Sequence, residues 1–149
     1  MENELEVVNI RLVKEPSLYS EQTLDNPQAV VELMAKELSQ YDREVFCILN
    51  MKNNGQVINM NLVSVGTINA SLVIPREVFK SSILANASAI IGLHNHPSGN
   101  PEPSREDILV TRKIKACGEL LDILLMDHII IGDNRYFSFR EQDILFEKG

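Results

Sequence analysis

The feature that most constrains the fold is a pair of strand-like segments joined by a tight turn. Residues 45–51 form a run that is apolar except for Asn50, which is typical of a strand covered on both faces. Lys52-Asn53-Asn54-Gly55 supplies the turn, and residues 57–65 predict the returning strand. This hairpin makes a β-sheet the centre of the fold.

Helical periodicity on both sides of the hairpin adds helices to this sheet. Apolar residues recur at helical spacing over 26–41 and 75–86, and each segment has a proline suited to the first turn. A third helix is predicted from Ser104 to about Cys117, where Gly118 is expected to end it. Strands are predicted between and after these helices, at 88–93, 121–131 and 135–139. The alternation predicts an α/β domain around a mixed sheet.

The start of the chain has no such regularity. Residues 1–24 are interpreted as an irregular N-terminal lead with one strand-like stretch at 7–13. The folded domain is expected at 25–149, a length that points to a single domain.

Composition narrows the class of protein. Hydrophobic residues make up 44% and charged residues 23% of the 149 residues, as in soluble globular domains. The formal net charge of −7 disfavours direct binding to the phosphate backbone of nucleic acid. The acidic N-terminus does not resemble a secretory signal, and Cys47 and Cys117 form no paired motif. We therefore expect a cytoplasmic protein with free thiols and no membrane segment.

Two of the three histidines lie two positions apart at the end of a predicted strand. Side chains at this spacing point the same way, roughly 6.6 Å apart at the backbone, so His94 and His96 can reach one metal ion. Asp107 lies in the first turn of the next predicted helix, and the loop between can fold it over the strand end. Two imidazoles and a carboxylate leave one position open on a zinc ion, as in catalytic zinc sites.

A structural interpretation of Asp107 is also available. Ser104-Arg105-Glu106-Asp107 has the spacing of a capping box, in which the first and fourth side chains cap the start of a helix. On the residues alone, a metal site and a capped, non-catalytic loop both remain open, and the two are compatible.

The spacing of these residues resembles the signature of the JAMM (MPN-plus) metalloproteases, H-x-H-x7-S-x2-D. Its fixed positions are held here by His94, His96, Ser104 and Asp107. The flanking text at 94–101 and 124–132 resembles the bacterial RadC-like branch of that family. The resemblance runs from residue 25 to about 139 and implies the JAMM fold, a curved mixed sheet flanked by helices in a cytidine-deaminase-like architecture.

The resemblance also implies a chemistry. Family members are zinc-dependent hydrolases of amide bonds, often isopeptide bonds at a lysine side chain. One zinc ion per chain is implied, with His94, His96 and Asp107 as its ligands. The implied partner is a protein or peptide substrate, which the sequence does not name.

Two further residues take roles by resemblance. The family uses an upstream glutamate to take a proton from the attacking water, and its counterpart is Glu44, with Asp42 as the second candidate. Ser104 is implied to donate a hydrogen bond to the oxyanion of the tetrahedral intermediate.

Two other functions remain as alternatives to the hydrolase. Full-length RadC proteins carry an N-terminal helix-hairpin-helix region associated with DNA binding, and this sequence resembles the short form without it. An accessory protein of DNA repair or of a mobile element is therefore one alternative, acting by binding DNA or a partner. A non-catalytic MPN interaction module is the other.

The remaining reactive residues are interpreted as structural. His128 lies in an apolar run and reads as a core histidine, with a supporting role behind a metal ligand as the alternative. Cys47 and Cys117 are interpreted as small core residues. The basic residues Arg112, Lys113 and Lys115 are interpreted as a solvated helix face.

Overall fold

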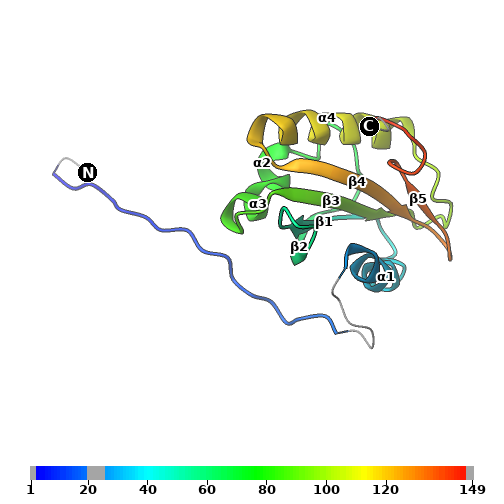
Figure 1. The fold of residues 1–149 in the computed structure, drawn as a ribbon, viewed down its shortest axis with the longest axis horizontal. Coiled ribbons are helices and arrows are strands. Elements are labelled where there is room, and N and C mark those ends of the chain that lie inside the picture. The colour runs from blue at the N-terminus through cyan, green and yellow to red at the C-terminus, as the bar shows by residue number, and fades with distance from the viewer. Residues whose placement is uncertain (1–2, 20–25, 147–149) are drawn as a thin grey trace.

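A computed structural model describes residues 3–19 and 26–146 and places five strands in one mixed sheet (Figure 1). The strand order across the sheet is β2-β1-β3-β4-β5. β1 runs antiparallel to β2 and β3, β3 and β4 are parallel, and β5 returns antiparallel to β4. The strands are β1 (Val45–Met51), β2 (Val57–Val65), β3 (Ala89–Asn95), β4 (Leu124–Ile131) and β5 (Tyr136–Ser138). The predicted α/β class is confirmed.

Helices cover both faces of the sheet. They are α1 (Pro27–Leu38), α2 (Pro75–Val78), α3 (Lys80–Leu84) and α4 (Arg105–Leu121). α1 lies on one face, and α2 to α4 lie on the other (Figure 1). Within the described part of the chain, none of the helices combines the length and the hydrophobicity that a membrane span requires.

The two covered faces explain the apolar run that the sequence places at the centre. Side chains alternate along β1, so that Phe46 and Ile48 pack in the half of the core under α4. Cys47 and Leu49 pack in the other half, against α1. All residues of β1 and β3 are therefore buried.

Several predicted boundaries are wrong, and tertiary packing accounts for two of them. The helix expected at 75–86 is divided at Phe79, whose side chain is buried in the core, into α2 and α3. α4 continues past Gly118 to Leu121, and Asp122 takes the left-handed cap conformation with φ 58°. Gly118 is needed inside the helix because a Cβ at this position would overlap the backbone oxygen of Ile123.

Other boundaries differ by a few residues. α1 ends at Leu38 instead of Tyr41, and β4 begins at Leu124 instead of Leu121, because Leu121 is the last residue of α4 and Asp122 caps that helix. The strand-like stretch at 7–13 does not form a strand: residues 3–19 form neither helix nor strand, and their side chains are exposed. Alternating apolar residues there have no neighbouring strand to pair with.

Candidate metal centre

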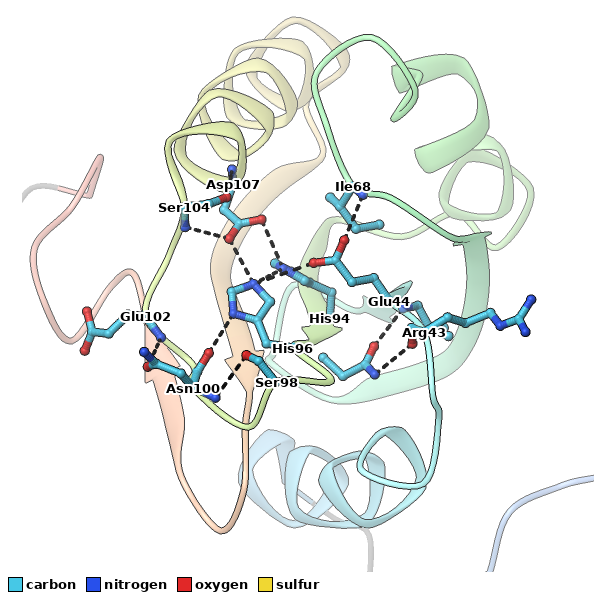
Figure 2. A network of polar contacts seen from close by, with 12 residues as sticks. Arg43, Glu44, Ile68, His94, His96, Ser98, Asn100, Glu102, Ser104 and Asp107 are labelled. Carbon is cyan, nitrogen blue, oxygen red and sulfur yellow. Dashed lines mark hydrogen bonds and ion pairs between the residues drawn. The ribbon is translucent and has the colours of Figure 1, made fainter.

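Four side chains from three parts of the fold meet at the end of β3 (Figure 2). Glu44 directly precedes β1, His94 lies in β3, His96 follows β3, and Asp107 lies in the first turn of α4. Because β1 is antiparallel to β3, its first residues adjoin the last residues of β3, and Phe46 pairs with His94. One possible ligand atom from each of the four side chains lies within 4.8 Å of the others.

The spacing of the three predicted ligands fits a zinc ion. His94 Nε2 and His96 Nε2 are 3.2 Å apart. Asp107 Oδ1 is 3.2 Å from His94 Nε2, and Asp107 Oδ2 is 3.0 Å from His96 Nε2. Ligands at 2.0–2.1 Å in a tetrahedron are separated by roughly 3.3 Å. The donor types and their separations are therefore compatible with a metal ion such as zinc bound by three protein side chains.

Both imidazole rings present the same nitrogen to the centre. His96 Nδ1 is 2.8 Å from the carbonyl oxygen of Asn100, which can only accept, so this nitrogen carries a proton. His94 Nδ1 is 2.7 Å from His128 Nε2. The Nε2 atoms of His94 and His96 are thus both directed at Asp107.

Asp107 caps its helix and faces the histidines at the same time. Its Oδ2 accepts a hydrogen bond from Ser104 N at 2.8 Å, and Ser104 Oγ accepts one from Asp107 N at 3.1 Å. The predicted capping box is present, and the same carboxylate belongs to a group that could hold a metal ion. The two interpretations that the sequence left open are therefore compatible in one side chain.

The electrostatics of the centre keep Asp107 charged. Burial raises the pKa of Asp107, but the close contacts with His94 and His96 lower it by more, and the net pKa lies well below the ordinary value. The hydrogen bond with Asp107 raises the pKa of His96, with burial acting in the opposite direction. Burial, followed by the charge of His94, holds the pKa of His128 well below its ordinary value. A buried carboxylate that stays ionised between imidazoles attracts a cation.

Glu44 stands at the open side of the cluster. Its Oε1 lies 3.8 Å from His96 Nε2, and its Oε2 accepts a hydrogen bond from Ile68 N at 3.1 Å. The side chain is partly buried. Asp42, the second candidate, has an 86% exposed side chain that pairs with Arg43 and lies outside the group.

Sequence reasoning did not single out Asn95, which positions Glu44. Asn95 Oδ1 accepts from Val45 N at 2.7 Å, and its Nδ2 donates to the Arg43 carbonyl oxygen at 3.0 Å. These bonds hold the backbone on both sides of Glu44 against the end of β3. The available signal was a polar residue between the two histidines in an otherwise apolar strand.

A known family matches most of the chain. The model of the RadC-like JAB domain matches residues 24–144. The chain belongs to the RadC-like JAB-domain family. The resemblance seen in the sequence is thereby confirmed.

Individual relatives agree with this assignment. The RadC-like domain is 48% identical over 122 residues to a UPF0758 protein of Desulfitobacterium hafniense, covering 82% of this chain and 54% of the relative. It is 46% identical over 126 residues to a UPF0758 protein of Moorella thermoacetica, an alignment that covers 85% of this chain and 55% of the relative. A UPF0758 protein of Methanosarcina mazei is 44% identical over 119 residues, which cover 80% of this chain and 52% of the relative. The chain spans about half the length of these curated relatives.

The other residues predicted to be structural have varied surroundings in this RadC-like domain. Cys47 is buried and Cys117 partly buried, and both are free thiols. On α4, Arg112 is exposed, Lys113 Nζ donates to the Ala70 carbonyl oxygen at 2.6 Å, and Lys115 pairs with Glu119 at 2.9 Å. His128 is buried but is more than a packing residue, because it contacts the candidate ligand His94.

Proposed function

We propose that this protein is a zinc-dependent hydrolase of amide bonds, of the metallopeptidase or isopeptidase type. The observation that carries the proposal is the convergence of Glu44, His94, His96 and Asp107 within 4.8 Å in a RadC-like JAB domain. A non-catalytic interaction module needs none of these four side chains, so their joint presence favours the hydrolase.

Three residues would hold the metal. His94 and Asp107 are fully buried, and His96 is partly buried, so the ion would lie at the edge of the core with one side toward substrate. A zinc ion in such a site acidifies a water molecule and polarises the carbonyl of the scissile bond.

Glu44 supplies the proton transfer in this proposal. Its Oε1 faces the centre, while Oε2 is held by Ile68 N, so the carboxylate has one oxygen available to a water molecule. Glu44 would take a proton from the attacking water and deliver it to the leaving amine. A fixed carboxylate with a free oxygen is suited to both steps.

Ser104 supplies a hydrogen-bond donor. Its Oγ accepts the N–H of Asp107, which uses a lone pair and leaves the single hydroxyl proton free. That proton would be donated to the oxyanion that forms when water attacks the carbonyl. An oxyanion donor of this kind is worth about 3–4 kcal/mol of transition-state stabilisation.

The proposal is tested with protein purified without an affinity tag or added metal. We expect about one zinc per chain in the wild type and none in His96→Ala, measured by elemental analysis. With fluorogenic peptides and lysine ε-isopeptides as probes, Glu44→Gln should keep its zinc and lose hydrolysis by at least about 100-fold. Glu102→Gln is the matched control, because Glu102 is exposed and lies outside the cluster.

Two results would contradict the proposal. Wild-type protein that takes up no zinc even when zinc is supplied has no metal centre. A fully active Glu44→Gln variant would remove Glu44 from the mechanism.

A further inference from the structure

We propose that His128 and Thr111 are positioning residues that hold His94 in the tautomer that frees its Nε2 for the metal. The inference rests on the proposed metal centre and adds a hydrogen-bond relay behind it. The relay runs from His94 through His128 to Thr111 and ends on the backbone of Asp107. All three side chains in the relay are buried, with at most 1% of each exposed.

The sheet brings His128 to His94. β3 and β4 are parallel neighbours, and Gly92, two residues before His94, pairs with His128. A Cβ at Gly92 would lie 3.5 Å from His128 Cδ2 and 3.3 Å from Cζ of Phe46. The missing side chain at Gly92 therefore leaves room for the His128 ring beside His94.

Aromatic packing fixes the plane of the His128 ring. The ring stacks on Phe139 with centroids 4.9 Å apart and an interplanar angle of 3°. It stands nearly perpendicular to the Phe46 ring, with centroids 5.7 Å apart and an interplanar angle of 77°. In this orientation His128 Nε2 lies 2.7 Å from His94 Nδ1, and His128 Nδ1 contacts Thr111 Oγ1.

With a metal bound, only one arrangement of protons satisfies every hydrogen bond of the relay. His94 Nε2 then uses its lone pair on the metal, so the proton of the neutral ring is on Nδ1. This N–H donates to His128 Nε2, which must be bare because a hydrogen bond holds a single proton. The proton of His128 is therefore on Nδ1 and is donated to Thr111 Oγ1.

Thr111 completes the relay because its hydroxyl has a second acceptor. Thr111 Oγ1 lies 2.7 Å from the carbonyl oxygen of Asp107 and donates its own proton there. The oxygen of the hydroxyl is then an acceptor for His128 Nδ1. Each donor has one acceptor, and no buried polar atom of the relay is left without a partner.

The opposite direction of the relay would block the metal. If Thr111 donated to His128 Nδ1, His128 would carry its proton on Nε2 and donate to His94 Nδ1. His94 would then carry its proton on Nε2, where the metal must bind. The shared hydrogen bond thus forces His94 and His128 into the same tautomer, and only one of the two tautomers permits binding.

The test compares two variants that differ in the ability to accept a hydrogen bond. His128→Gln keeps an acceptor near the position of Nε2, whereas His128→Met has a similar length and no useful acceptor. Zinc affinity, measured by competition with a chelating dye, should fall about 10–100-fold in His128→Met. His128→Gln should recover most of that loss, which a purely space-filling role would not produce. Equal affinities of folded wild type and His128→Met would overturn the inference.

A measurement on the wild type covers the case in which His128→Met does not fold. Nitrogen-15 chemical shifts of the imidazole rings report which nitrogen carries the proton. With zinc bound, we expect the proton on Nδ1 of both His94 and His128, and a proton on His128 Nε2 would overturn the relay.

The same spectra separate this inference from the proposed function. Without metal, the two rings should still share one tautomer, and opposite tautomers would refute the relay whatever the metal does. If the wild type takes up no zinc but the rings share a tautomer, the metal centre fails as a proposal and the hydrogen-bond coupling stands.

Discussion

The carboxylate of Asp107 serves the helix and the candidate metal centre with different lone pairs. Oδ2 accepts from Ser104 N and contacts His96, while Oδ1 faces His94. An ionised carboxylate offers about four acceptor positions, so capping does not exhaust it. The backbone N–H of Ser104 also fixes the rotation of the carboxylate. The capping box therefore orients the candidate ligand as well as starting the helix.

Cys47 gives a prediction about pH at the scale of one residue. Burial raises the pKa of the Cys47 thiol to about 12, whereas an unfolded thiol ionises near pH 8.5. Above that pH the unfolded chain loses the proton and the folded chain keeps it, so the free energy of unfolding falls by up to about 1.4 kcal/mol per pH unit. Below that pH the thiol is protonated in both the folded and the unfolded chain, so the contribution of its burial to stability is fully present.

Urea unfolding of the wild type and of Cys47→Ala from pH 7 to 10 measures this effect. The stability advantage of the wild type over the variant should shrink above about pH 8.5. Cys117→Ala serves as the control and should keep the steeper pH dependence. Parallel curves for wild type and Cys47→Ala would mean that the thiol ionises while buried.

At the scale of the element, α4 contains a glycine whose replacement by alanine should lower the free energy of unfolding, whereas helix propensity alone predicts an increase. Alanine in place of an interior glycine stabilises an exposed helix by about 1 kcal/mol. At Gly118 the new methyl group would overlap the Ile123 oxygen and lie 3.3 Å from the Phe79 ring. Gly118→Ala should therefore lower the free energy of unfolding by about 1–3 kcal/mol. Ala116→Gly, at an exposed position two residues earlier, should cost only about 1 kcal/mol. A stabilised Gly118→Ala, measured in urea, would contradict the packing.

Elements whose boundaries are set locally could be predicted from the sequence. The bounds of β1 and β2 agree with prediction, because an apolar run and a four-residue turn define them. The break at Phe79 and the continuation through Gly118 depend on side chains from other elements, which local periodicity does not contain.

The same distinction applies to the candidate site. His94, His96 and Asp107 could be recognised because they lie close together in the chain. Glu44 was placed only by resemblance, since strand pairing brings it to His96 across 52 positions. The link between His94 and His128 spans 34 positions, and only the parallel pairing of β3 with β4 reveals it.

At the scale of the whole molecule, the candidate ligands join separate parts of the fold. β3 supplies His94 and the loop after it supplies His96, while Asp107 belongs to α4. α4 is also the crossover between β3 and β4 and packs on one half of the core. An ion at this centre would connect the sheet to that helix, so opening either one would release it.

Zinc should therefore stabilise the entire domain by mass action. At a free zinc concentration 100 times the dissociation constant, the expected gain in the free energy of unfolding is about 2.7 kcal/mol. For a domain of this size that corresponds to a rise in Tm of about 5–11 °C. Differential scanning calorimetry with zinc and with a chelator measures the shift, and His96→Ala should lose it. A shift that persists in His96→Ala would place the zinc elsewhere. No shift in a wild type that binds zinc would mean that the ion binds the unfolded chain equally well, through His and Cys side chains freed from the fold.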